Sequence, residues 1–125
     1  MNCHAETKKI QEVIRNYTEG TFEGDAAKLA KAFHPNAVMN GFLGDNLLLA
    51  TPQAFIDDIA NNPPMATQNV PYNAEIESIR IEGDVAAVVL SETGFRGAGQ
   101  FVDFFHLIKD NGEWKIISKL FITVF

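Results

Sequence analysis

The sequence predicts an α+β fold, in which three helices pack against one face of a curved, mostly antiparallel sheet. Three observations support this prediction. Apolar residues recur at helical spacing in the first half of the 125-residue chain. The second half contains runs that are rich in β-branched and aromatic residues. The last two runs are joined by a short Asn-Gly turn, which is typical of a hairpin. Residues 1–125 should therefore form a single domain with one core.

Two helices are expected at the start of the chain. The first should run from about Thr7 to Gly20, because four apolar residues follow the i, i+3, i+4, i+7 pattern of one helix face. These residues are Ile10, Val13, Ile14 and Tyr17. The second should begin after Asp25, which can cap it, and continue through Phe33 until Pro35 stops it.

A third helix and two short strands follow. Strands are expected at 37–39 and 47–50, on either side of a turn-rich segment. The pair Thr51-Pro52 is typical of a helix start, because proline fits the first helical position. The apolar side chains of this third helix are Phe55, Ile56 and Ile59.

The longer strands come later in the chain. A change of phase near Ser78 indicates a bulge, because Ile76 falls on one face and Ile79 on the other. The apolar run at 85–90 predicts a strand that is covered on both faces.

The closing hairpin places one acid among apolar side chains. Its strands should span 101–109 and 113–121, around the turn at 110–112. Alternation puts Asp103 on the same face as Phe101, Phe105 and Leu107, and His106 on the opposite face. The last strand is apolar on both sides. Trp114, Ile116, Leu120, Ile122 and Val124 are expected on one face, and Ile117, Phe121 and Phe125 on the other. We therefore expect a homodimer through the sheet.

Composition limits the function classes. A formal net charge of −6 disfavours nucleic-acid binding, which depends on clustered Lys and Arg. The single cysteine cannot form an internal disulfide, and we expect a cytoplasmic protein without a signal peptide, membrane span, metal or cofactor. A hydrophobic fraction of 46% with ten Phe is high for this length. Some of that apolar surface should line a cavity or an interface.

Several segments together resemble the nuclear transport factor-like superfamily of cone-shaped, cystatin-like α+β domains. The resemblance runs from about Ile10 to Phe125. Within the superfamily the chain is most similar to the putative lumazine-binding and SnoaL-like bacterial branches. The segments are Gly24-Asp25, 33–37, Thr51-Pro52, 103–105, 112–116 and Lys119, with the Gly-Phe-Leu-Gly stretch at 41–44.

The superfamily includes ketosteroid isomerase, dehydratases and cyclases, and also members without a known reaction. The resemblance implies that Tyr17 corresponds to the oxyanion-hole tyrosine of the isomerases and Asp103 to their protonated aspartic acid. The general-base aspartate does not carry over. Its place falls at Gly41 or beside it at Asn40, and neither can abstract a proton at neutral pH.

Each candidate site residue also has a structural interpretation. Asp103 is either a neutral acid on the pocket floor, within hydrogen-bond reach of the Tyr17 hydroxyl directly or through one water, or a partly exposed carboxylate at a sheet margin or dimer contact. Tyr17 is either a core tyrosine or a pocket residue. His34 is more typical of a helix cap than of a catalyst, and His106 of a core or interface residue.

The function that the sequence favours is the binding of a small apolar or aromatic molecule between the first helix and the curved sheet. The candidate ligand-binding residues are Tyr17, Phe33, Phe55, Phe101, Asp103 and Phe105. One alternative is an isomerase, dehydratase or cyclase that acts on a ketone through Tyr17 and Asp103. The other is a structural dimerisation module whose cavity is filled by its own Phe side chains.

Overall fold

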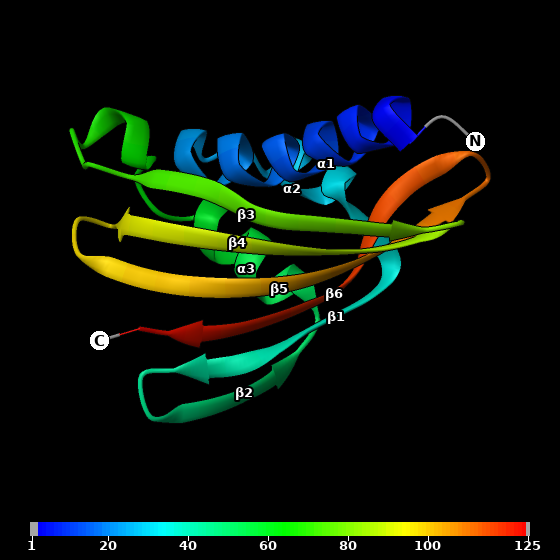
Figure 1. The fold of residues 1–125 in the computed structure, drawn as a ribbon. Helices are drawn as coiled ribbons and strands as arrows, with labels where there is room; N and C mark the ends of the chain where they lie inside the picture. Colours follow the sequence, from blue (N-terminus) through cyan, green and yellow to red (C-terminus); the bar gives the residue numbers. More distant parts are fainter. Residues whose placement is uncertain (1–2, 125) are drawn as a thin grey trace.

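The structure is a computed structural model that describes residues 3–124, and its architecture is α+β. In this part of the chain three α-helices and one short 3-10 helix accompany a six-stranded sheet (Figure 1). The helical elements are α1 (Cys3–Glu23), α2 (Ala26–Ala32), α3 (Pro52–Ala60) and η1 (Met65–Thr67). The strands are β1 (Phe33–Leu43), β2 (Asn46–Ala50), β3 (Asn73–Glu82), β4 (Val85–Phe95), β5 (Gly99–Asp110) and β6 (Glu113–Thr123).

The sheet is mixed, with the strand order β2-β1-β6-β5-β4-β3. Every neighbouring pair is antiparallel except β1 and β6, which run parallel. The chain therefore returns at its end to insert β6 between β1 and β5. This topology places inward-pointing side chains of β6 near the middle of the sheet, where the helices cover them.

One face of the sheet is buried against the helices and forms the core. The predicted stripe of α1 is confirmed, because Ile10, Ile14 and Tyr17 are almost completely buried in the core cluster. Figure 1 shows α3 behind the curved sheet and α1, with α2 beside it, along the upper edge of the sheet in that view. On β4 the buried residues alternate strictly: Ala86, Val88, Leu90 and Glu92. A residue on this inner face is removed from solvent whether it is apolar or charged.

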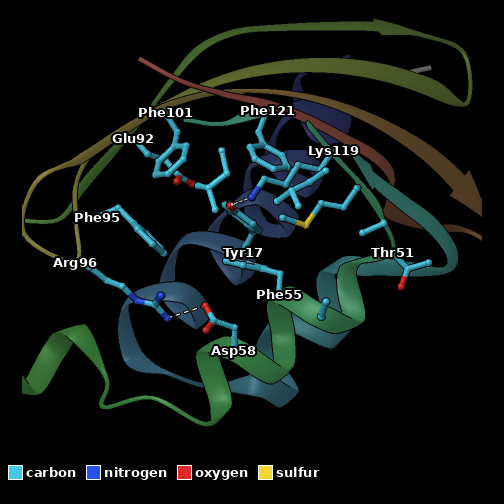
Figure 2. Close-up of a pocket in the computed structure, with 15 residues that line it drawn as sticks. Tyr17, Thr51, Phe55, Asp58, Glu92, Phe95, Arg96, Phe101, Lys119 and Phe121 are labelled. Carbon is cyan, nitrogen blue, oxygen red and sulfur yellow. Dashed lines mark hydrogen bonds and ion pairs between the residues drawn. The ribbon is translucent and has the colours of Figure 1, made fainter. Parts of the chain in front are cut away.

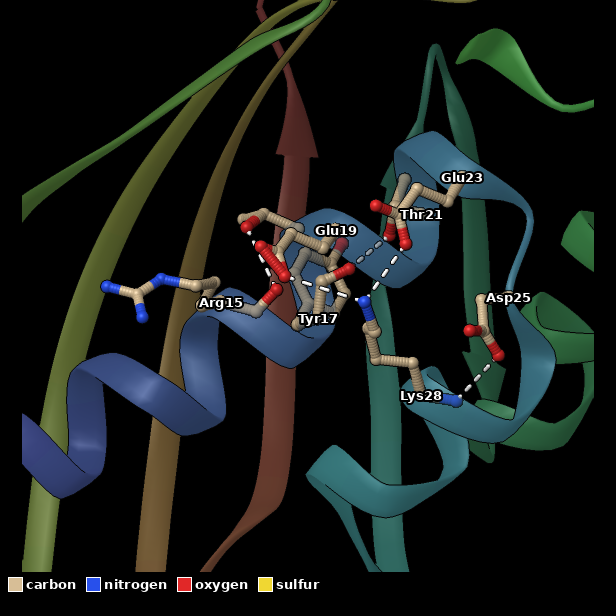
Figure 3. A network of polar contacts seen from close by, with 8 residues as sticks. Arg15, Tyr17, Glu19, Thr21, Glu23, Asp25 and Lys28 are labelled. Atoms are coloured by element: carbon tan, nitrogen blue, oxygen red, sulfur yellow. Dashed lines mark hydrogen bonds and ion pairs between the residues drawn. The ribbon is translucent and has the colours of Figure 1, made fainter. Parts of the chain in front are cut away.

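The junction between α1 and α2 is fixed by polar contacts (Figure 3). The Asp25 side chain accepts a hydrogen bond from the backbone N–H of Lys28 at 3.0 Å, which confirms it as the N-cap of α2. The Lys28 ammonium donates to Glu23 at 3.0 Å. One turn earlier, the Thr21 hydroxyl donates to the backbone oxygen of Tyr17 at 2.7 Å. These contacts fix how the chain passes from the end of α1 into α2.

Most predicted elements are present, with changed boundaries. The first helix begins four residues before Thr7 and ends three after Gly20. Phe33 begins β1 instead of ending the second helix, because Pro35 lies two residues further on and disfavours helical backbone before it. The bulge near Ser78 and the Asn-Gly hairpin turn are confirmed. Asn111 and Gly112 both have positive φ, as a tight two-residue turn requires.

Two predictions about strand faces are wrong. The run at 85–90 is covered on one face only, since Val85 and Ala87 are exposed. In β6 a register shift opposite His106 and Leu107 inserts Ile117 as an extra residue. Trp114 and Ile116 therefore point inward, as Phe121 does, whereas Leu120 and Ile122 point outward. Phe125 lies outside the described residues.

The outer face of the sheet carries many apolar residues that are exposed to solvent. We define the outer patch as six residues on the adjacent strands β1, β6 and β5, of which all but Val38 pair with another member: Val38, Phe42, Val102, Phe104, Leu120 and Ile122. Five of them are more than 40% exposed, and Val102 is half-buried. Within the described residues, no helix is long and apolar enough to cross a membrane.

Candidate functional site

A pocket of about 290 Å³ opens between α3 and the inner face of the sheet (Figure 2). Its walls come from α1, α3, β1, β2 and the inner residues of β4, β5 and β6. The lining residues are Tyr17, Met39, Leu43, Leu48, Ala50, Thr51, Ala54, Phe55, Asp58, Glu92, Phe95, Arg96, Phe101, Lys119 and Phe121. Because α3 supplies three of them, the pocket is bordered mainly by α3, and the first helix, which was expected to form one wall, contributes Tyr17.

Aromatic rings form much of the pocket wall. Phe95 and Phe101 meet edge to face, with centroids 5.5 Å apart, and Phe101 continues to Phe121 at 6.5 Å. Phe55 faces them from α3 and stacks on Tyr17 at 5.9 Å. Edge-to-face and offset-stacked pairs are favourable arrangements for aromatic rings. The result is an apolar wall whose planar groups can pack on a planar ligand.

The inner end of the pocket is polar, and Lys119 is its main donor. The lysine is 5% exposed, and its ammonium donates to the Tyr17 hydroxyl at 2.6 Å. Its Nζ lies 4.5 Å from the centroid of the Phe55 ring, 4.8 Å from that of Tyr17 and 5.3 Å from that of Phe121. Aromatic faces at such distances stabilise a cation electrostatically. The ammonium is therefore held in a fixed place by three rings and one hydroxyl (Figure 2).

Two buried carboxyls lie beside this lysine. Asp103 is completely buried, and its Oδ1 is 3.9 Å from Lys119 Nζ, too long for a hydrogen bond. Glu92 is 3% exposed. Within residues 3–124, both carboxyl oxygens of Asp103 and Oε1 of Glu92 have no hydrogen-bond partner. Burying a hydrogen-bond acceptor without a donor destabilises the folded protein. The two carboxyls would therefore be stabilised by protonation or by a hydrogen-bond donor.

Burial raises the pKa of Asp103 well above its ordinary value of 3.8. The Lys119 charge lowers this pKa and the neighbouring Glu92 carboxyl raises it, but desolvation is the largest effect. Burial therefore favours the neutral form of the Asp103 carboxyl, which lies close to the Glu92 side chain. Burial, with Glu92 and Asp103 nearby, also raises the pKa of Tyr17 and Tyr72, so both phenols keep their protons.

An ion pair crosses the mouth of the pocket. The Arg96 guanidinium donates to Asp58 Oδ2 at 2.8 Å, which connects the turn after β4 to α3. Arg96 has a φ of 50°, and its Cζ lies 5.2 Å from the centroid of the Phe95 ring. Both charged side chains are more than 40% exposed, so this pair contributes little stability. Its position lets it border the entrance that a ligand would use.

The predicted site residues fall into two groups. Tyr17, Phe55 and Phe101 line the pocket, whereas Phe33, Phe105 and Asp103 lie behind its wall. Phe33 and Phe105 pack edge-on against the Tyr17 ring, at centroid distances of 6.1 and 5.0 Å.

The expected pairing of Asp103 with Tyr17 is also different in the structure. The Tyr17 hydroxyl is bonded to Lys119, and no direct bond joins it to Asp103 among the described contacts. The interpretation of Asp103 as a partly exposed carboxylate is wrong, because the residue is completely buried.

Sequence reasoning gave too little weight to Glu92 and Lys119. From the sequence, Glu92 fits either a pocket mouth or a solvated position, yet it follows the same two-residue alternation as the buried Val88 and Leu90. That alternation was a usable signal. Lys119 entered only as part of the family resemblance, and its inward direction depends on the bulge at Ile117.

Gly41, the position nearest the missing general base, is an inner-face residue of β1. A Cβ atom built there would lie 2.0 Å from the backbone oxygen of Phe121, because β1 and β6 approach each other closely. No side chain fits without a backbone shift. The structure therefore explains why an acid is missing at this position.

The two internal histidines lie away from the pocket. His34 Nε2 is 2.9 Å from Asp110 Oδ2, and its Nδ1 accepts from the backbone N–H of Asn36 at 3.0 Å. It follows the start of β1 and makes these contacts instead of capping a helix. His106 is exposed on the outer face, so a core position for it is wrong. Within residues 3–124, no group of three His, Cys, Asp or Glu side chains could hold a metal ion.

Known structures share this architecture. An NTF2-like protein of unknown function from Shewanella baltica is 29% identical, with 99% of this chain and 98% of that chain covered at a TM-score of 0.88. Another, from Methylobacillus flagellatus, is 26% identical over 97% and 94% of the two chains, with a TM-score of 0.87. A ketosteroid isomerase-like protein from Erwinia carotovora is 15% identical over 94% and 95%, with a TM-score of 0.67, and shows likeness of fold alone.

No curated protein matches the chain at a significant level. The model of the family described as putative lumazine-binding matches residues 5–122, which is nearly the whole chain. The chain therefore belongs to the putative lumazine-binding family, a branch of the NTF2-like superfamily.

Proposed function

We propose that this protein binds a small apolar or aromatic molecule in the pocket between α3 and the sheet. One observation carries the proposal: a cavity of about 290 Å³ has aromatic walls and three polar side chains at its inner end. Ligand pockets are usually of this size and of this mixed composition. The chain's membership of a family described as putative lumazine-binding is consistent with a small-molecule ligand.

The proposal can be tested by filling the pocket with a larger side chain and measuring how much ligand binding is lost. Ala54 lines the pocket on α3, so Ala54→Trp should fill much of it. Ala60 is exposed at the end of the same helix and does not line the pocket, so Ala60→Trp is the matched control. Coumarin, a planar apolar bicyclic compound, serves as the probe in calorimetry. We expect binding to the native protein and the control, and at least tenfold weaker binding to Ala54→Trp. Equal binding of coumarin to all three proteins would refute the proposal. So would the absence of binding to the native protein by both coumarin and its N–H analogue 2-quinolone.

The enzymatic alternative has less support from this geometry. Asp103 lies behind the pocket wall, and Gly41 cannot carry a general base without moving the backbone. Proton abstraction beside a ketone needs a positioned base, so we expect negligible turnover of a β,γ-unsaturated ketone. A structural module filled by its own Phe side chains is disfavoured by the open cavity.

We also propose that two copies associate through the outer patch. Exposed apolar side chains on adjacent strands form a contiguous surface of the kind that associates with a partner. The pocket opens on the opposite face of the sheet, so association would leave it accessible.

A further inference from the structure

The inner end of the pocket presents hydrogen-bond donors that are not fully used. The Lys119 ammonium has three N–H bonds, and its hydrogen bond within the described structure goes to the Tyr17 hydroxyl. The other nearby oxygen, Asp103 Oδ1, is 3.9 Å away and beyond hydrogen-bond reach. Lys119 lines the pocket and is held there by three aromatic rings. It can therefore donate to an acceptor atom of a bound molecule.

The same end also presents an acceptor without a donor. Glu92 lines the pocket, is 97% buried, and has no partner for Oε1 within residues 3–124. Among the described residues no Lys, Arg or His lies within salt-bridge distance of this carboxyl. Buried polar atoms are normally paired, so an N–H group of a ligand would relieve an existing cost at this point.

The charges around this end favour a neutral ligand. An anion against Lys119 would also be repelled by Glu92, and by Asp103 whenever that group is ionised. A cation against Glu92 would be repelled by Lys119, and by Arg96 at the mouth. A neutral group with one acceptor and one donor satisfies both sides without adding charge to a buried site.

We propose that the preferred ligands are planar cyclic amides, whose carbonyl oxygen accepts from Lys119 and whose adjacent N–H donates to Glu92. This inference rests on the proposed binding function and specifies the chemical class of the ligand. The flat ring would pack on the Phe rings that form the wall. The amide edge supplies one acceptor and one donor, one for each of the two groups that line the inner end.

Two probes of nearly identical shape test the contribution of the ligand N–H group alone. The lactam 2-quinolone has a ring N–H beside its carbonyl, and coumarin has a ring oxygen in that place. If the N–H meets Glu92, 2-quinolone should bind at least tenfold more tightly than coumarin, because coumarin leaves a buried charged acceptor unpaired. The acid 2-naphthoate should bind more weakly than coumarin. Affinities are measured by calorimetry on the full chain at pH 7.

Variants then separate the two contacts. Glu92→Gln should bring the affinity ratio of 2-quinolone to coumarin close to one, while Lys119→Met should weaken both probes about equally, by roughly tenfold, and keep the ratio. The matched controls are Glu113→Gln and Lys8→Met, two exposed positions away from the pocket, which should leave both affinities unchanged. Circular dichroism confirms that each variant is folded, and the probe ratio on the native protein tests the inference even if one is not.

The outcomes distinguish this inference from the broader proposal. If neither coumarin nor 2-quinolone binds, the proposed binding function fails. If both bind equally to the native protein, the pocket function stands and the amide inference is overturned. Tightest binding of 2-naphthoate would also overturn it, because the pocket would then select an anion.

Discussion

Replacing Asp103 with Asn tests whether the folded protein holds a proton on this buried acid. The side chain is completely buried, both of its oxygens lack partners, and burial raises its pKa well above 3.8. Lys119 lies 3.9 Å away and opposes this shift without cancelling it. Asn has nearly the same shape and carries no charge at any pH. We therefore expect Asp103→Asn to fold.

The pH dependence of stability follows from the direction of the pKa shift. A carboxyl whose folded pKa is raised contributes stability that is fully present below its unfolded pKa and is lost as pH rises towards the folded pKa. This pH window begins near the ordinary Asp103 pKa of 3.8. Within it, the unfolding free energy of the native protein should fall by about 1.4 kcal/mol per pH unit because of this group. Because charged neighbours of Asp103 influence its titration, this slope is an upper limit. The Asp103→Asn variant lacks this pH dependence. Its unfolding free energy should therefore increase relative to that of the native protein as pH rises.

Urea unfolding at pH 4.5, 5.5, 6.5 and 7.5, followed by Trp114 fluorescence, gives the difference in unfolding free energy directly. Asp45→Asn, at an exposed turn, is the control that should show no such trend. Asp103→Leu should destabilise at every pH, because it replaces a polar group beside the buried Lys119 ammonium, 3.9 Å away, with an apolar one. A protonated Asp103 is refuted if the difference in unfolding free energy between the native protein and Asp103→Asn stays constant with pH, or if the variant becomes relatively less stable as pH rises. Either result would show that Asp103 is ionised in the folded protein.

Three further predictions concern other parts of the molecule. Gly41→Ala should cost about 3 kcal/mol or more of unfolding free energy, because its Cβ would meet the Phe121 backbone oxygen, and a stable variant would show that β1 can move away from β6. Leu120→Glu should raise the dimer dissociation constant about a hundredfold or more, since each copy would bury a carboxylate, and light scattering that finds the native protein monomeric would refute this contact. Glu6→Gln should destabilise the protein at pH 7 but not at low pH, because the hydrogen bond from Trp114, followed by that from Lys109, lowers the pKa of Glu6 below its ordinary value of 4.5. Stability that depends on a lowered pKa is present above the unfolded value and is lost as pH falls through the folded one, so equal destabilisation at both pH values would contradict the assignment.

Local patterns were sufficient to predict much of the fold. The helical spacing that ends at Tyr17 and the two-residue alternation around Asp103 depend only on neighbours in sequence, and the structure confirms both as buried faces. The Asn-Gly turn of the closing hairpin is equally local. These patterns specify which side chains are buried, which is why Asp103 could be identified as an inward-pointing acid.

The position of the pocket depends on contacts between distant segments, which no local pattern contains. Phe33 and Phe105 were predicted as lining residues because they are apolar and point inward, but the Tyr17 ring lies between them and the cavity. Whether α1 or α3 borders the open space is decided by how the helices are placed on the sheet. The requirement for Gly41 likewise arises from the parallel approach of β1 to β6, a contact across about eighty residues of sequence.

The direction of Lys119 shows how a single residue decides the chemistry of the site. Strict alternation from Trp114 and Ile116 would place residues 118 and 120 on the inner face, with Lys119 in solvent. The extra residue at Ile117 reverses this phase, so that Lys119 points inward opposite Phe105 while Leu120 points outward opposite Phe104. Because the strand is apolar on both faces around this point, the hydrophobic pattern does not mark the bulge. The same insertion therefore supplies the ammonium of the pocket and an apolar residue of the outer patch.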